Sequence, residues 1–365
     1  MDIFSPVRIG MLELPNRIVM APMARARCNA DRAANALVAE YYAQRASAGL
    51  IITEAGSVSP LSVSRPHGAA IHAALHAAGW RLVADAVHAA GGRIFQQIYH
   101  LGRKSDPSRM PDGVAPVAPS AIAAVGQVSG INGPVSFAVP RALESDEIAG
   151  VVAQFGAAAA HAKRAGMDGV EIHGANGYLI DQFLRSATNK RTDAHGGSPA
   201  NRARFLLEVV DAAIAVFGAA GVGVRFSPHA TADGIGDADP VATFGYAART
   251  LNDRGIAYVH LIEALKPGLR QSPSQDVPAI MPVIRKAFSG PLIVNGGYDK
   301  ASANEAIASG MADLVAFAVP YISNPDLVER LACDAALNAP DASTFYEGGA
   351  KGYTNYPFLR ETVRA

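Results

Sequence analysis

Cysteine is scarce in the 365-residue chain, with only Cys28 and Cys333 at its two ends. Two such distant cysteines fit neither a disulfide framework nor a metal-binding motif. The N-terminus also lacks a basic segment followed by an apolar stretch, which is typical of a signal peptide. We therefore expect a cytoplasmic protein without disulfides.

An excess of charge and long apolar runs are also missing. Lysine plus arginine equals aspartate plus glutamate at 32 each, whereas a nucleic-acid partner normally requires a basic face. No run reaches the ~20 consecutive apolar residues that a membrane span needs. We expect neither nucleic acid nor membrane as a partner, and a small molecule as substrate.

Several catalytic motifs are absent as well. No G-x-S-x-G supplies a serine nucleophile, and no strand end carries a lysine for a Schiff base. His100 and His173 could join Glu54 around a metal, but no H-x-H or H-E-x-x-H spacing supports this, so we expect no metal.

Short β-branched runs alternate with longer alanine-rich segments, a pattern typical of parallel strands wrapped by helices. The predicted strands are 18–20, 50–54, 93–99, 169–173, 223–226, 258–262, 292–295 and 314–317. The predicted helices lie near 36–48, 77–90, 145–165, 200–217, 241–254, 277–288, 301–309 and 325–332. Eight such units predict an α/β fold, a (β/α)8 TIM barrel. A doubly wound sheet is the alternative, but no G-x-G-x-x-G follows a first strand.

Barrels of this kind remain one domain at lengths where other cores divide, so we expect residues 1–365 to form a single domain. Residues 1–15 suggest a hairpin that closes the bottom of the barrel. The 103–142 segment is too long for an ordinary loop and suggests an insertion after strand 3, acting as a lid or carrying small strands. Ser145 and Ser198 are the predicted N-caps of two helices.

The run 168–178 places His173, Asn176 and Tyr178 in a glycine-broken loop just after a strand. Two neutral hydrogen-bond donors and a phenol can hold an oxyanion and protonate a carbon. A histidine at a strand end can equally be structural. Gln97 and Arg225 at other strand ends suit a planar, anionic redox cofactor, although Arg225 could instead form a structural salt bridge. Gly296 and Gly297 follow strand seven, where barrels often bind phosphate, or they form an ordinary turn.

With these positions assembled, the chain resembles the old yellow enzyme family of FMN-dependent ene-reductases. The segments that carry the resemblance are 14–23, 41–55, 174–184, 189–193 and 349–357.

The resemblance implies non-covalent FMN, reduced by NADPH or NADH, and reduction of α,β-unsaturated carbonyls, nitroalkenes or maleimides, and of nitro compounds or nitrate esters. His173 and Asn176 would hold the substrate oxygen, Tyr178 would protonate the α-carbon, and Tyr99 and Tyr356 would contact the substrate. The residues that would bind FMN are Pro22, Ala24, Ala55, Gln97, Arg225, Gly296, Gly297, Ala318 and Val319. A monomer or homodimer is expected.

Four positions depart from the family pattern. Ala24 replaces a threonine or cysteine beside the flavin, and Tyr99 replaces a tryptophan. Ala318 and Val319 stand where the family has Gly-Arg, so the arginine that faces the phosphate is missing. These changes leave a second hypothesis open, a barrel that binds a ligand or flavin without efficient turnover. Isomerisation on reduced flavin is less favoured because Tyr178 is present.

Overall fold

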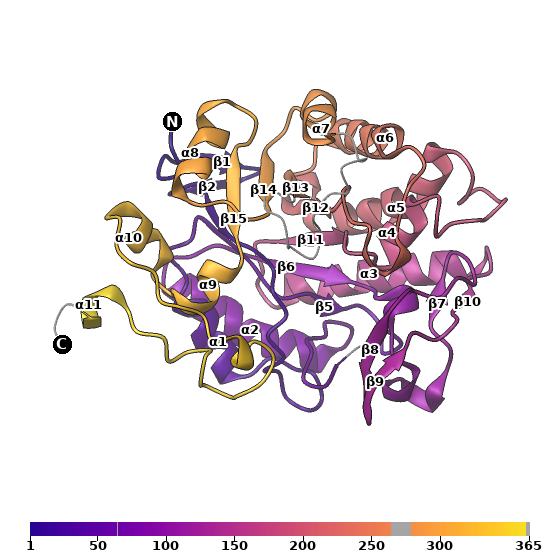
Figure 1. The fold of residues 1–365 in the computed structure, drawn as a ribbon, viewed down its shortest axis with the longest axis horizontal. Coiled ribbons are helices and arrows are strands. Elements are labelled where there is room, and N and C mark those ends of the chain that lie inside the picture. The colour runs from indigo at the N-terminus through magenta and orange to yellow at the C-terminus, as the bar shows by residue number, and fades with distance from the viewer. Residues whose placement is uncertain (64, 264–278, 363–365) are drawn as a thin grey trace.

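A closed sheet of eight parallel strands forms the centre of the molecule in a computed structural model that describes residues 1–63, 65–263 and 279–362 (Figure 1). Each strand pairs with the next along the chain, β15 pairs with β3, and β6 pairs with both β4 and β11, which closes the barrel. The barrel strands are β3 (Ile18–Met20), β4 (Leu50–Ile52), β6 (Ile94–Tyr99), β11 (Gly169–Gly174), β12 (Val222–Phe226), β13 (Tyr258–Ile262), β14 (Leu292–Asn295) and β15 (Leu314–Phe317). The short β5 (Gly56–Ser57) extends the pairing along β6. The predicted (β/α)8 barrel is confirmed.

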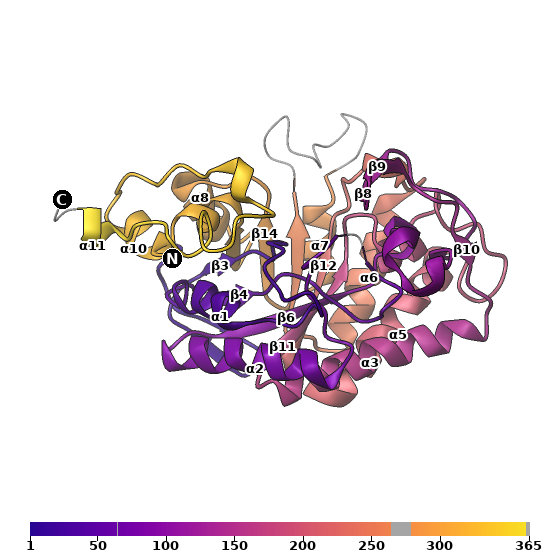
Figure 2. The ribbon, with the colours of Figure 1, turned by 90° about the horizontal axis from the view of Figure 1, so that it is seen from below.

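Helices surround this barrel and bury its outer face (Figures 1 and 2). The helices that follow the strands are α1 (Ala36–Ala43), α2 (Ala74–Ala89), α3 (Glu147–Arg164), α5 (Pro199–Phe217), α6 (Pro240–Asp253), α7 (Met281–Ala287), α8 (Lys300–Ala308) and α10 (Leu327–Ala332). The strands are buried along nearly their whole length and mostly apolar, because a parallel strand is covered on both faces. The start of the predicted helix 277–288 lies outside the described residues, and its described part is α7.

One of the two predicted N-caps is wrong. The Ser198 side chain accepts a hydrogen bond from the Asn201 N–H at 3.2 Å and caps α5, as predicted. Helix α3 instead begins at Glu147 with Asp146 as its N-cap. The Ser145 hydroxyl donates to the Asp193 carboxylate at 2.6 Å, so a tertiary contact takes the side chain that local sequence assigned to the helix.

A hairpin of β1 (Val7–Ile9) and β2 (Leu12–Leu14) precedes the barrel. Ile9 and Leu14 pack with residues of the barrel strands such as Leu50 and Phe95 in one buried apolar cluster. Gly10 has φ of 52°, and a Cβ there would lie 2.1 Å from the Ala220 carbonyl oxygen, so the turn requires glycine. The hairpin is therefore part of the core.

The 103–142 segment carries short strands beyond the barrel. These are β7 (Val117–Ala118), which pairs with β10 (Arg141–Ala142), and the antiparallel pair β8 (Gln127–Gly130) and β9 (Gly133–Ser136). Figure 2 shows β8 and β9 on the side of the molecule away from α3. The Val125 N–H donates to the Asp233 carbonyl at 3.0 Å, which joins this segment to the loop after β12.

Several short helices were not predicted. They are α4 (Leu179–Leu184), α9 (Val319–Ser323), α11 (Leu359–Thr362) and the 3-10 turns η1 (Gly102–Lys104), η2 (Pro107–Arg109), η3 (Pro111–Gly113), η4 (Ala219–Gly221), η5 (Ala232–Gly234) and η6 (Ala342–Thr344). Within the described ranges, no helix has both the length and the apolar character that crossing a lipid bilayer requires.

Candidate active site

A cavity opens at the C-terminal ends of the barrel strands, where side chains from several strands converge. The predicted site residues that line it are Pro22, Ala24, Ala55, Gln97, Tyr99, His173, Asn176, Tyr178 and Arg225. Residues as far apart in the chain as Pro22 and Arg225 meet here because parallel strands end at the same rim. The structure thus brings nine of the predicted residues together.

His173, Asn176 and Tyr178 form one wall of this cavity. His173 is in β11, and the chain turns through Asn176 and Gly177 at φ of 60° and 69° before Tyr178 caps α4. The Asn176 Nδ2 lies 3.3 Å from the His173 Nε2, and the rings of His173 and Tyr178 are 4.9 Å apart at 82°. Two nitrogens at this separation can both contact one substrate oxygen.

Burial keeps His173 neutral. The pKa of His173 is held well below its ordinary value, first by burial of the ring and then by the positive charge of Arg225 and by His260 and Lys104. Its Nδ1 has no hydrogen-bond partner among the described residues. A neutral imidazole can donate one hydrogen bond without bringing a permanent charge into the cavity.

Gln97 and Arg225 line the same cavity from β6 and β12, the two strands that pair with β11, and connect to polar groups inside the barrel. The Gln97 Nε2 donates to Glu171 at 2.6 Å, and the Arg225 Nη2 donates to the Asn295 side-chain oxygen at 3.0 Å. The buried Arg225 Nε has no partner among the described residues, so a donor remains for a bound molecule. A fixed guanidinium and an amide at the base of a cavity fit the electron-rich edge of a flavin.

Gly296, Gly297, Ala318 and Val319 do not line this cavity. They follow the neighbouring strands β14 and β15, which places them at the same rim. Gly296 has φ of 140°, and a Cβ there would lie 1.4 Å from the Glu263 carbonyl oxygen, so only glycine fits. Val319 is the first residue of α9 and is 49% exposed. Gly296 is buried, Gly297 and Ala318 are half-buried, and the exposed apolar side chain of Val319 stands where the family pattern predicted an arginine.

Tyr356 is also not among the residues that line the cavity. Its hydroxyl accepts a hydrogen bond from the Asp341 N–H at 2.9 Å. The structure instead adds Arg65, Gly68 and Ala69 from the loop that leads to α2. Sequence reasoning missed them because this loop has neither periodicity nor a motif.

The family and its solved structures can be compared with this geometry. The profile of the NADH:flavin oxidoreductase / NADH oxidase family matches residues 2–338. The chain belongs to this family, the old yellow enzymes. As an old yellow enzyme family member it is an FMN-dependent oxidoreductase, and it shares its barrel fold with its solved relatives.

The similarity extends over almost the whole old yellow enzyme chain. A probable flavin mononucleotide-dependent alkene reductase of Leishmania infantum is 42% identical over 360 residues, covering 97% of each chain. The structure of morphinone reductase in complex with tetrahydroNAD has a TM-score of 0.92 at 46% identity, covering 98% of each chain. The old yellow enzyme homologue from Zymomonas mobilis has a TM-score of 0.95 at 41% identity, covering 98% of this chain and all of that one.

Proposed function

We propose that this enzyme reduces the activated C=C bond of small electron-poor alkenes, namely α,β-unsaturated carbonyls, nitroalkenes and maleimides, and that it also accepts nitro compounds or nitrate esters. The observation that carries the proposal is the meeting of a neutral His173 with Asn176 and Tyr178 in one cavity. Relatives described as alkene reductases support the same reaction class.

His173 and Asn176 bind the carbonyl or nitro oxygen of the substrate. Negative charge grows on this oxygen during reduction, and each positioned donor can stabilise it by about 3–4 kcal/mol. Tyr178 then gives its phenolic proton to the α-carbon, a role that typically accelerates a reaction by about 10²–10⁴-fold. Tyr99 lies beside Tyr178, with ring centroids 5.3 Å apart, and limits the shape of the pocket.

The residues that would hold FMN are Pro22, Ala24, Ala55, Gln97 and Arg225 in the cavity, with Gly296, Gly297, Ala318 and Val319 at the phosphate. Bound FMN supplies the hydride that reaches the substrate β-carbon, and NADPH or NADH is its source. The Arg225 Nε, which has no partner among the described residues, supports this placement of the cofactor.

We further propose a cytoplasmic monomer or homodimer. The 103–142 segment is proposed to act as a lid, since it reaches the loop after β12 beside Tyr178.

The test is a two-step reaction of the FMN-loaded protein under anaerobic conditions. NADPH or NADH should bleach the flavin absorbance, and cyclohexenone or a maleimide should restore it with formation of the saturated product. A flavin that is bleached but not reoxidised by any of these alkenes would contradict the proposal.

The second candidate is a barrel that binds a ligand or flavin without efficient turnover. Ala24 and Val319 favour it because both remove polar groups from the cofactor site. In that case the protein would bind FMN, but NADPH and NADH would not bleach it at a useful rate.

A further inference from the structure

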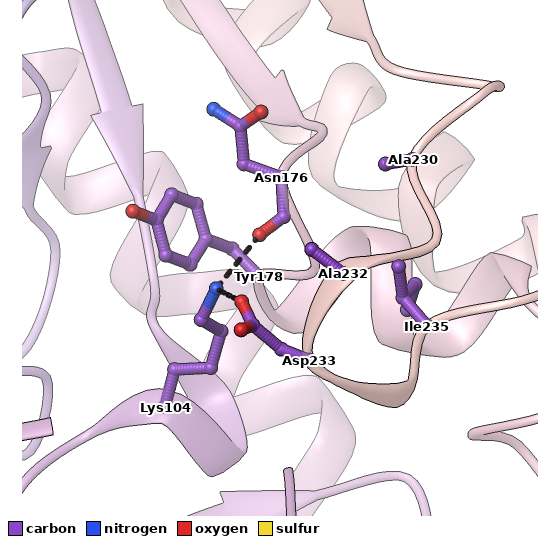
Figure 3. Close-up of a pocket in the computed structure, with 7 residues that line it drawn as sticks. All are labelled: Lys104, Asn176, Tyr178, Ala230, Ala232, Asp233 and Ile235. Carbon is purple, nitrogen blue, oxygen red and sulfur yellow. Dashed lines mark hydrogen bonds and ion pairs between the residues drawn. The ribbon is translucent and has the colours of Figure 1, made fainter. Parts of the chain in front are cut away.

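Lys104 is a charged side chain buried directly behind the substrate-binding turn. It ends η1, just after β6, and is only 8% exposed. Buried lysines are rare because removing an ammonium from water is costly unless a partner compensates. Here the Lys104 ammonium forms an ion pair with Asp233 of η5 (Figure 3).

The same ammonium contacts two residues of the proposed catalytic set. Its Nζ donates to the Asn176 carbonyl oxygen at 3.2 Å and lies 5.2 Å from the centre of the Tyr178 ring. Figure 3 shows Lys104 between the Asn176 carbonyl and Asp233, with the Tyr178 ring alongside. A cation near an aromatic face is attracted to it, and the attraction strengthens where water is excluded.

The Lys104 contact falls on a strained part of the backbone. Asn176 and Gly177 are consecutive residues with positive φ, a conformation that an L-residue such as Asn176 adopts at a cost. The Asn176 N–H donates to the Ser227 hydroxyl at 2.8 Å, while its carbonyl accepts from Lys104. Ser227 thus holds the peptide group before Asn176, and Lys104 holds the peptide group after it.

The charge of Lys104 also acts on His173, the third residue of the proposed catalytic set. It contributes, after burial, Arg225 and His260, to keeping the pKa of His173 low. Negative charge formed on the substrate oxygen, or on Tyr178 after proton donation, would feel the same positive charge.

From these contacts we infer that Lys104 is a positioning residue for alkene reduction, which fixes the Asn176–Gly177 turn so that the Asn176 amide and the Tyr178 phenol meet the substrate together. The inference rests on the proposed function, since it assigns Lys104 to the step in which Asn176 and Tyr178 act. It predicts that Lys104 influences the alkene step and leaves reduction by the nicotinamide largely unchanged.

The test uses FMN-loaded K104M, which keeps the apolar stem without the charge, and K104R, which keeps the charge. Single-turnover reoxidation by cyclohexenone should slow about tenfold in K104M, equivalent to 1.4 kcal/mol, and recover to within about threefold in K104R. Reduction by NADPH and reoxidation by ferricyanide, which accepts electrons without a proton on carbon, should change less than twofold. If K104M does not fold, K104Q, which keeps an N–H donor without the charge, replaces it.

Two further variants separate the possible failures. Lys163 is the matched control, because its Nζ lies 5.7 Å from the Phe217 ring on the outer helices, and K163M should behave as wild type. If Y178F slows the cyclohexenone step more than tenfold but K104M leaves it unchanged, the role of Lys104 is wrong and the proposed function stands. If Y178F also leaves the step unchanged, the proposed role of Tyr178 fails first. Equal slowing of the cyclohexenone and ferricyanide reactions in K104M would show a general structural effect and overturn the inference.

Discussion

An arginine restored at position 319 should tighten FMN binding. Val319 is 49% exposed at the start of α9, beside the rim glycines of β14, so a longer polar side chain can extend into solvent without displacing the core. A charge-assisted hydrogen bond to phosphate contributes about 1.5–3 kcal/mol. Because exposed ion pairs lose much of their energy to solvent, we take the lower end, about 1.5 kcal/mol. The expected Kd of V319R for FMN is therefore about tenfold lower.

The measurement is a titration of apo-protein against the fluorescence of FMN at low and high salt. The gain should shrink as salt rises, since the Debye length falls to about 3 Å at 1 M. Riboflavin has no phosphate, so V319R should leave its Kd unchanged. Val241, 37% exposed in the first turn of α6, gives the matched control V241R. An equal gain for riboflavin, or an unchanged FMN Kd, would show that the phosphate does not lie where position 319 can reach it.

Three further outcomes follow from the site and the core. N176A removes one of the two oxygen donors and should slow alkene reduction about 10²-fold without slowing reduction by NADPH, as followed by stopped-flow absorbance; equal losses in both would refute a role confined to the substrate. A24T adds a hydroxyl beside the flavin and should shift the reduction potential of the flavin, measured by spectroelectrochemistry. An unchanged potential would contradict the placement of residue 24 beside the flavin. Burial lowers the pKa of His100 from 6.5 to about 4, so the unfolded chain binds this proton first as pH falls below 6.5. The free energy of unfolding should therefore drop by about 2 kcal/mol at pH 5 from this group, and H100Q should show a flatter pH dependence in chemical denaturation.

The barrel was predictable because its strands are short, continuous apolar runs separated by helices of regular period. Every predicted strand overlaps an observed one, and β3, β13, β14 and β15 match to the residue. Helices α4 and α9 escaped because six and five residues are too few for a periodic signal. Ser145 was assigned to the wrong contact because its partner, Asp193, is distant in sequence.

The site residues were likewise predictable where they are close in sequence and not where only the fold brings them together. His173, Asn176 and Tyr178 lie within six residues and could be read from one motif. Lys104 could not, because its importance depends on Asp233, a residue from another loop that only the fold brings to it. Neither residue belongs to a local pattern that would indicate the pair.

A buried residue inside the barrel fixes the orientation of the Gln97 side chain at its rim. Although burial opposes ionisation of Glu171, His260 and Arg225 hold the pKa of Glu171 below its ordinary value, so it is a carboxylate. A carboxylate accepts hydrogen bonds only, so the Gln97 amide must turn its nitrogen toward Glu171, as observed at 2.6 Å. The Gln97 oxygen is thereby left as the acceptor for a bound ring.

The same carboxylate compensates the buried guanidinium of Arg225. Burial lowers the pKa of Arg225, and the negative charge of Glu171 opposes that change. The second oxygen of Glu171 is taken by the His260 Nδ1 at 2.9 Å, which leaves the carboxylate fixed on both sides. Sequence reasoning placed Gln97 and Arg225 at the cofactor and gave Glu171 no role, but it is this fully buried residue that orients one and balances the charge of the other.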